Sequence, residues 1–135
     1  PQVLSFLELA ALDLRALGVE KTRIALDYGI GFGKTVEQNF ALLARQDRLL
    51  ALGYPLLAGW SRKSSLGGVT GLPVQDRLAP SVAAAVLAVE RGARIVRVHD
   101  VRETVAALAV WRAVQTQTSD AAGAAAPPTS IDKKD

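Results

Sequence analysis

A carboxylate followed by a glycine-rich segment is the first place in the sequence where a ligand could be held. Asp27 ends a short apolar run, and residues 29–33 after it alternate glycine with other residues. Tyr28 stands where a Walker A motif needs its first glycine, and the spacing does not match Gly-x-Gly-x-x-Gly either. Glycines still let a backbone approach a ligand, and a helix N-terminus after them favours anions. We therefore expect residues 29–33 to form either a ligand-binding loop or an ordinary turn. Asp27 could accept hydrogen bonds from an amino-pyrimidine or bind a metal, or it could cap the turn.

Two basic segments further along the chain could hold an electron-rich or anionic ligand. Ser61, Arg62 and Lys63 follow an apolar run and offer cationic donors, unless they form a solvated basic loop. Arg97 and His99 are two positions apart on a predicted strand, so they face the same way and suit a phosphate or pyrophosphate. The alternative for His99 is a capping or core histidine.

His99 is the single histidine of the chain, which excludes a metal site built on several histidines. Composition allows a Ser-His-Asp triad from Ser61, His99 and Asp100. The sequence has no Gly-x-Ser-x-Gly elbow, however, and Asp100 should point away from its neighbour His99.

Each of these segments lies in one copy of a repeated unit. The unit consists of a helix, a glycine that ends it, a short apolar strand and a polar loop. Glycines at positions 18, 53 and 92 end the helices, and Thr35 with Gln38 predicts a capping box. The predicted strands are residues 23–27, 55–59 and 94–98, and the predicted helices cover about residues 4–17, 35–50, 80–91 and 100–113. This alternation predicts an α/β fold with parallel strands and flanking helices. Because ligands gather at the carboxyl ends of such strands, the three segments should meet at one edge.

Composition limits the class of protein. The chain has 135 residues, of which 50% are hydrophobic, so we expect one domain with a buried core. The absence of cysteine excludes disulfides, cysteine-zinc sites and thiol catalysis. A net charge of +3 is too small and scattered for a nucleic-acid surface, and no apolar run approaches the ~18 residues of a membrane span. We expect a cytoplasmic protein whose domain covers residues 1–114, with residues 115–135 as a disordered tail rich in Ala, Pro, Ser and Thr.

Taken together, three segments resemble, in order and spacing, the last three strand-loop signatures of the dihydropteroate synthases, a family of pterin-binding enzymes. They are residues 27–35 (DYGIGFGKT), 59–64 (GWSRKS) and 97–101 (RVHDV). The resemblance covers residues 1–114 and implies part of a (β/α)8 TIM barrel with strands six to eight. A complete barrel takes about 250 residues, so the N-terminal half would lie outside this chain. The first residue is not Met, which fits a piece of a longer protein.

The resemblance also implies an activity. Dihydropteroate synthase is a transferase of folate biosynthesis that joins hydroxymethyl-dihydropterin pyrophosphate to p-aminobenzoate and releases pyrophosphate. It uses Mg²⁺, whose ligand is expected in the missing N-terminal half, so no metal site is expected in this part of the chain. The complete parent protein is expected to be a homodimer, and this chain alone is expected to be inactive.

Individual roles carry over to the matching positions. Asp27 would bind the amino-pyrimidine edge of the pterin, and Lys63 would contact its carbonyl and ring nitrogen. Phe32 and the stem of Lys63 would line the p-aminobenzoate slot, with Ser61 near the carboxylate. The pyrophosphate would be held by Arg97 and His99, which count with Lys63 as catalytic. The loops would add two further substrate-binding residues, Gly31 and Arg62.

Three residues depart from the family pattern. Tyr28 replaces a proline, Trp60 replaces a smaller aliphatic residue, and Pro80 stands where Gly-Ser usually opens a helix. Two other hypotheses stay open beside the synthase. The chain could be a non-catalytic or partner-dependent half-barrel that pairs its open strand edges with another chain. It could also belong to another pterin-binding barrel, such as a methyltetrahydrofolate methyltransferase.

Overall fold

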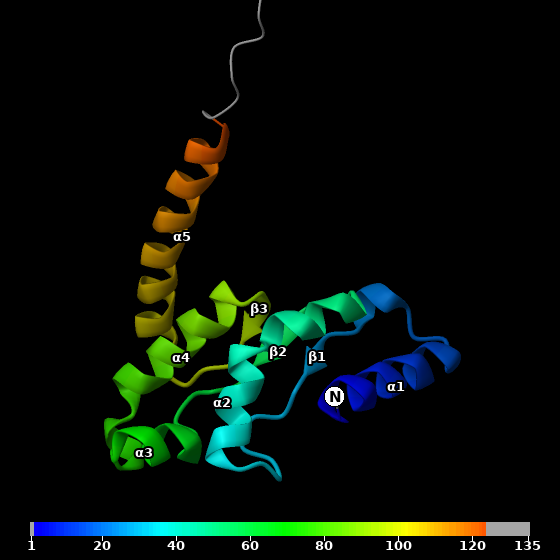
Figure 1. The fold of residues 1–135 in the computed structure, drawn as a ribbon, viewed down its shortest axis with the longest axis horizontal. Coiled ribbons are helices and arrows are strands. Elements are labelled where there is room, and N and C mark those ends of the chain that lie inside the picture. Colours follow the sequence, from blue (N-terminus) through cyan, green and yellow to red (C-terminus); the bar gives the residue numbers. More distant parts are fainter. Residues whose placement is uncertain (1, 124–135) are drawn as a thin grey trace, which may run out of the picture.

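Three short parallel strands form the centre of the chain, and helices lie around them (Figure 1). The structure is a computed structural model and describes residues 2–123. Its elements, in chain order, are the helices and strands α1 Gln2–Ala16, β1 Leu26–Asp27, α2 Val36–Ala44, β2 Leu56–Ala58, α3 Ser64–Thr70, α4 Leu78–Glu90, β3 Ala93–Val96 and α5 Val101–Gly123. Short 3-10 helices cover Lys21–Arg23, Gln46–Leu52 and Val74–Asp76.

The sheet confirms the predicted parallel α/β arrangement. The strand order is β1-β2-β3, with Leu26 opposite Leu56 and Leu57 opposite Ile95. Each strand is shorter than predicted, because only the residues in register with a neighbour form ladder hydrogen bonds. Arg23, for example, lies in a 3-10 turn and not at the start of β1. Parallel strands place their carboxyl ends at one edge, so the loops after β1, β2 and β3 emerge together.

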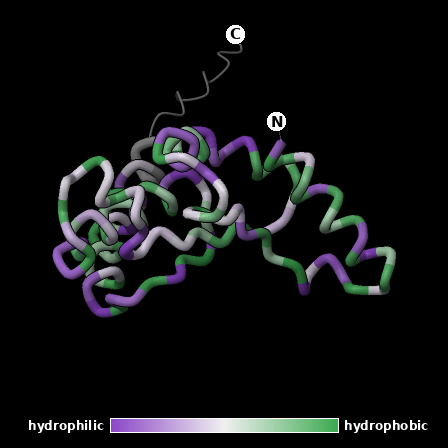
Figure 2. The backbone as a smooth tube through the Cα atoms, turned by 90° about the horizontal axis from the view of Figure 1, so that it is seen from below, coloured by the Kyte–Doolittle hydropathy of each residue, from purple (hydrophilic) through white to green (hydrophobic). Residues whose placement is uncertain are grey.

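Apolar side chains fill the space between the sheet and its helices. Leu56 in the central strand and Ala88 in α4 are both fully buried, and Leu7 and Ala11 bury the inner face of α1. In Figure 2, hydrophobic and hydrophilic residues alternate along α1. That helix therefore contributes one face to the core and leaves the other exposed, with Phe6 and Leu9 on the exposed face.

Local signals placed most helix ends correctly. Thr35 and Gln38 form the predicted capping box, each side chain bonding the backbone N–H of the other. Gly53 has the left-handed conformation expected of a helix stop, with φ 75°. Between these ends the structure differs from the prediction of one helix, because α2 ends at Ala44 and a 3-10 helix continues to Leu52. Pro80 is the third residue of α4, inside the first turn, where a missing N–H costs nothing.

Two predictions about the second half of the chain are wrong. The loop from Ser61 to Gln75 contains the helix α3, whose buried Leu66 gives it an inner face. The last helix does not end near Ala113, since α5 continues to Gly123, and residues 115–123 of the predicted tail are therefore helical. This end of α5 projects away from the body (Figure 1). Residues 124–135 lie outside the described part of the chain.

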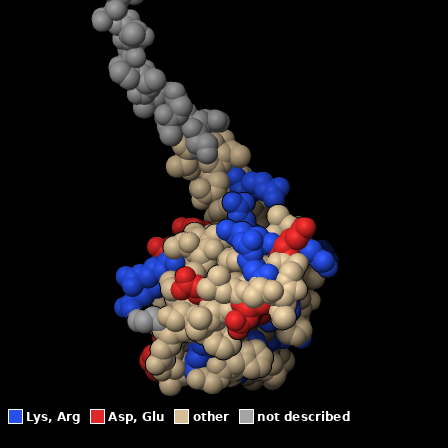
Figure 3. Space-filling view, turned by 90° about the vertical axis from the view of Figure 1, so that its right-hand side faces the viewer, with Lys and Arg blue, Asp and Glu red and all other residues tan. Residues whose placement is uncertain are grey.

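Charged side chains of both signs share the surface. Figure 3 shows Lys and Arg in separate groups on one face, with Asp and Glu between them. Within residues 2–123, no helix combines the length and the hydrophobicity needed to cross a bilayer.

Candidate functional site

The loops that follow the three strands are joined by side-chain contacts at the carboxyl edge of the sheet. Arg97, after β3, reaches Asp27 at the end of β1, and Ser61, after β2, reaches His99. The backbone N–H of Arg97 also donates to the Ala58 carbonyl of β2 at 3.0 Å. The structure therefore brings together residues from all three predicted segments.

Asp27 uses each of its carboxylate oxygens separately. Oδ1 accepts the Gly29 backbone N–H at 2.9 Å, which caps the turn after β1. Oδ2 accepts from Arg97 Nη1 at 3.0 Å, and the two side chains remain 35% and 57% exposed. Turn capping and ligand binding are compatible at this residue, because the capping bond uses only Oδ1, and Oδ2 takes part in a partly exposed ion pair for which a bound molecule can compete. In the described residues, no group of three His, Cys, Asp or Glu side chains could hold a metal ion.

Ser61 and His99 form a polar pair in which Ser61 is buried and His99 is exposed. The Ser61 Oγ lies 2.8 Å from His99 Nδ1 and accepts the backbone N–H of His99 at 3.1 Å, and Ser61 is only 7% exposed. This pair fixes the imidazole ring from its Nδ1 side. Asp100 does not complete a triad, since its carboxylate binds Arg62 Nη2 at 2.8 Å. The prediction that Asp100 points away from His99 is therefore supported by its actual partner.

Lys63 and Phe32 lie together on the open side of the loops. The Lys63 ammonium is 4.5 Å from the centre of the Phe32 ring, and Phe32 is 66% exposed. Gly31 makes this approach possible, since it has φ 83° and a Cβ there would lie 3.1 Å from Lys63 Cδ. The exposed ring offers an apolar face, and the lysine beside it a cationic donor, to a flat, electron-rich ligand.

Lys34 is used inside its own loop. Its ammonium donates to the carbonyls of Gly29 and Phe32, at 2.8 and 3.1 Å. The lysine therefore closes the glycine-rich loop from within, and the P-loop comparison fails on geometry as well as on spacing.

A buried asparagine that sequence reasoning missed ties two of the loops together. Asn39 in α2 is 1% exposed, accepts the Gly31 N–H at 3.3 Å and donates to Ser65 Oγ at 2.8 Å. It therefore links the glycine-rich loop to the helix that begins directly after Lys63. The sequence signal for this role is that Asn39 is a polar residue on the inner face of an apolar helix, where a buried polar side chain needs a hydrogen-bond partner.

Tyr28 and Trp60 both fill the layer beneath the site. The Tyr28 hydroxyl donates to Gln46 Oε1, and Gln46 in turn donates to the Ala88 carbonyl at 2.8 Å. Burial raises the pKa of the Tyr28 hydroxyl to about 12. The Trp60 ring packs on Phe40, with ring centres 5.1 Å apart. Tyr28 is thus anchored by its side chain, so the turn after Asp27 is held without the proline of the family pattern.

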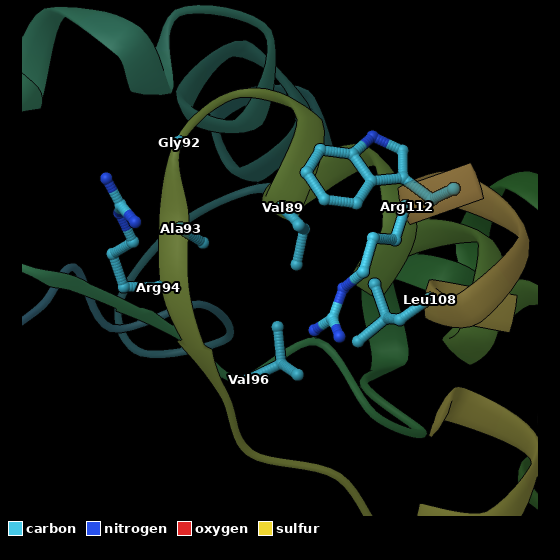
Figure 4. Close-up of a pocket in the computed structure, with 8 residues that line it drawn as sticks. Val89, Gly92, Ala93, Arg94, Val96, Leu108 and Arg112 are labelled. Carbon is cyan, nitrogen blue, oxygen red and sulfur yellow. The ribbon is translucent and has the colours of Figure 1, made fainter. Parts of the chain in front are cut away.

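Two clefts flank these elements. One, of about 380 Å³, lies between α1 and the glycine-rich loop and is lined in part by Phe6, Tyr28 and Phe32. A second, of about 450 Å³, lies beside β3 and α5 (Figure 4), where Val96, Leu108 and Arg112 face one another. None of the predicted site residues lines the second cleft.

Known proteins match both the sequence and the fold. The dihydropteroate synthase of Haemophilus influenzae is 44% identical over 111 residues, which are 82% of this chain and 40% of that protein. A crystal structure of the Xanthomonas albilineans dihydropteroate synthase in complex with 7,8-dihydropteroate is 49% identical, with a TM-score of 0.83, and covers 84% of this chain and 44% of that one. Another structure of that enzyme, with 4-aminobenzoic acid, has the same identity and TM-score over 84% of this chain and 42% of that one.

These matches show how much of a complete relative the chain corresponds to. It spans about two fifths of the length of the relatives it resembles. The family described as "Pterin binding enzyme" matches residues 1–99, which contain every predicted site residue from Asp27 to His99. The chain therefore belongs to the pterin-binding enzyme family.

Proposed function

We propose that the complete protein is a dihydropteroate synthase and that this chain supplies the C-terminal part of its active site. The reaction joins hydroxymethyl-dihydropterin pyrophosphate to p-aminobenzoate. The observation that carries the proposal is the meeting of Asp27 with Arg97, and of Phe32 with Lys63, at one edge of the sheet. The ligands named for the Xanthomonas albilineans enzyme, 7,8-dihydropteroate and 4-aminobenzoic acid, are the chemistry that such a site would hold.

In this proposal the pterin lies against Asp27. Its Oδ2 accepts the donors of the amino-pyrimidine edge, while Oδ1 keeps its bond to Gly29. Lys63 donates to the pterin carbonyl and ring nitrogen, which are its acceptors. The ion pair between Asp27 and Arg97 is more than one third exposed at both ends, so a ligand can compete with it at little cost.

The pyrophosphate lies at Arg97 and His99. The nitrogen lone pair of p-aminobenzoate forms the new C–N bond to the pterin methylene carbon, and the C–O bond breaks with its electron pair passing to pyrophosphate. The nitrogen then loses a proton. C–O cleavage builds positive charge on the pterin and negative charge on the leaving group, so the Asp27 carboxylate and the Arg97 guanidinium each stabilise one of them.

p-Aminobenzoate occupies the slot beside Phe32 and the stem of Lys63. The exposed ring of Phe32 offers an apolar face to the benzene ring. Ser61, which the family pattern places near the aminobenzoate carboxylate, bonds His99 in this structure. We therefore propose that Ser61 positions His99.

The strands β1, β2 and β3 are strands six to eight of the barrel in this proposal. Both outer strands of the three-stranded sheet have one side without a partner strand in residues 2–123. The N-terminal half of the barrel would pair with these edges, which is also what the partner-dependent half-barrel hypothesis requires. The described residues do not fit a magnesium site, so no catalytic step is assigned to magnesium here, and its ligand is proposed to lie in the other half.

The proposal extends to the setting of the complete enzyme, which we place in the cytoplasm as a homodimer. Val101 and Val105, which lie one turn apart on the same side of α5, are each more than half exposed, and we propose that this apolar surface packs against a second subunit.

A genetic experiment tests the proposal. Residues 1–123 replace the matching segment of the Haemophilus influenzae enzyme, and the hybrid is expressed in a bacterium without its own dihydropteroate synthase. We expect growth without added folate products from the hybrid and none from the 135-residue chain. Growth with Lys63→Ala in the hybrid equal to that of the unchanged hybrid would contradict the assigned site. Calorimetry of the hybrid with pyrophosphate and with methyltetrahydrofolate separates the synthase from a methyltransferase.

A further inference from the structure

The turn that carries Ser61 and Lys63 contains a strained residue. Arg62 has φ 59° and is the one non-glycine residue with positive φ in residues 2–123. The N–H of Lys63 donates to the Trp60 carbonyl at 3.1 Å, so residues 60–63 form a tight turn with Arg62 at its third position. Glycine or asparagine is favoured at such a position, and a residue like arginine keeps this conformation only where its surroundings enforce it.

Two residues at the N-terminal end of α4, the N-cap residue Arg77 and Ser81 of the first turn, enforce it from both sides. Ser81 Oγ accepts the backbone N–H of Arg62 at 2.8 Å. Arg77 Nη1 donates to the backbone carbonyl of Arg62 at 3.1 Å. Both polar backbone groups of the strained residue are therefore held by α4, and Ser81 is itself 3% exposed.

The two holding residues are also fixed to one another and to α3. Ser81 Oγ donates to the Arg77 carbonyl, so its hydroxyl proton is used and its lone pair faces Arg62. Arg77 Nε donates to the Leu72 carbonyl at 3.0 Å, and its guanidinium lies where a side chain at Gly67 would collide with it. The arrangement is rigid because every donor and acceptor named here has a partner.

We propose that Ser81 and Arg77 are positioning residues that hold Arg62 in its left-handed conformation and thereby aim Ser61 and Lys63 into the active site. The reversal at Arg62 sends neighbouring side chains in different directions, with Ser61 bonded to His99 and Lys63 set over the Phe32 ring. The functional half of this proposal rests on the proposed synthase activity, whereas the conformational half does not. Pro80, a departure from the family pattern, leaves this device intact because Ser81 beside it keeps its hydroxyl.

The conformational half is tested in the 135-residue chain by amide hydrogen exchange at Arg62. Ser81→Ala removes the acceptor of the Arg62 N–H, and we expect that amide to exchange about tenfold faster, the upper range for loss of one hydrogen bond. Ser64→Ala, at an exposed position in the same region, is the matched control and should leave the rate unchanged. An unchanged Arg62 rate in Ser81→Ala would overturn the proposal.

A second variant separates strain from a general effect of a buried serine. In the Haemophilus influenzae hybrid, Ser81→Ala should raise KM for both substrates about tenfold, a size that matches one lost positioning hydrogen bond. When position 62 is already glycine, Ser81→Ala should raise KM much less, because glycine adopts positive φ without strain. The double variant is therefore compared with Arg62→Gly alone. If Ser81→Ala raised KM by the same factor in the hybrid with Arg62 and in the hybrid with Arg62→Gly, the proposal would be overturned. If the unchanged hybrid is inactive while Ser81→Ala still accelerates exchange at Arg62, the proposed function fails and the conformational role stands.

Discussion

Replacing Tyr28 by phenylalanine removes one hydroxyl from the layer between the sheet and its helices. In the wild-type chain that hydroxyl donates to Gln46, and both residues are at most 3% exposed. Tyr28→Phe leaves the Gln46 Oε1 buried without its donor, which costs about 1–3 kcal/mol of unfolding free energy. Tyr54→Phe is the matched control, because Tyr54 is only half-buried and its change should stay within about 0.5 kcal/mol.

The same hydroxyl gives this prediction a pH dependence. Its pKa is raised from 10.0 to about 12 in the folded chain, so the unfolded chain releases the proton first as pH rises. The stabilisation from this group is therefore fully present below pH ~10 and is lost as pH rises through ~12, by up to about 2.7 kcal/mol for two pH units. The difference between wild type and Tyr28→Phe should shrink by about 2 kcal/mol between neutral pH and pH ~11.5.

Urea unfolding of the 135-residue chain, followed by tryptophan fluorescence, measures both quantities. The wild type, Tyr28→Phe and Tyr54→Phe are compared at each pH, so that titration of lysines cancels in the differences. Equal stability of wild type and Tyr28→Phe at neutral pH would refute the buried hydrogen bond. A difference between them that stays constant up to pH ~11.5 would refute the raised pKa.

Three further changes test the site, and the first two of them separate binding from stability. Asp27→Asn should alter unfolding free energy by less than about 1 kcal/mol, because its pair with Arg97 is exposed, yet lower pterin pyrophosphate affinity more than about tenfold by calorimetry on the hybrid. Phe32→Ala, at a 66% exposed position, should leave the thermal midpoint unchanged but raise KM for p-aminobenzoate about fivefold, the size of one lost aromatic contact. Gly31→Ala forces a side chain into positive φ and against Lys63, so we expect a loss of about 1–2 kcal/mol in urea unfolding together with a higher KM. Unchanged substrate affinity in all three variants would contradict the proposal that the substrates bind at this edge of the sheet.

The parallel sheet, and the meeting of the three predicted segments at one edge of it, could be predicted because they depend on local, periodic signals. Apolar runs, stop glycines such as Gly53 and the Thr35–Gln38 capping box each act over a few residues, and they fix the order of helices and strands. That order alone places the carboxyl ends of the strands at one edge. The family resemblance then assigned roles to residues that the order had already brought together.

The helix α3 could not be predicted, because its stability comes from distant contacts. Its sequence, SSLGGVT, contains two glycines and a β-branched pair, which is poor helix-forming material. The helix is held by burial of Leu66 and by Arg77, which lies across Gly67. The polar pairs Tyr28 with Gln46 and Asn39 with Ser65 are likewise 18 and 26 positions apart, so no local pattern reveals them.

The extra length of α5 could not be predicted for a different reason. The apolar pattern fades after Ala113 and therefore predicts that the helix ends there. In the structure, however, the helix continues to Gly123, and this end of it projects from the body (Figure 1). Thr116 and Thr118 also bond the carbonyls of Ala113 and Val114 within the helix, at 2.8 and 3.0 Å.

The rate of dihydropteroate formation tests most directly whether this chain is the C-terminal part of a synthase site. Initial rates are measured with pterin pyrophosphate and p-aminobenzoate for the 135-residue chain, for the hybrid with the Haemophilus influenzae N-terminal part, and for the hybrid with Lys63→Ala. We expect the hybrid to work within about tenfold of the complete Haemophilus enzyme, and the isolated chain and the Lys63→Ala hybrid to show at least about a hundredfold less, since one group that stabilises transition-state charge is worth that much. A folded hybrid without activity, or an isolated chain as active as the hybrid, would contradict the proposal.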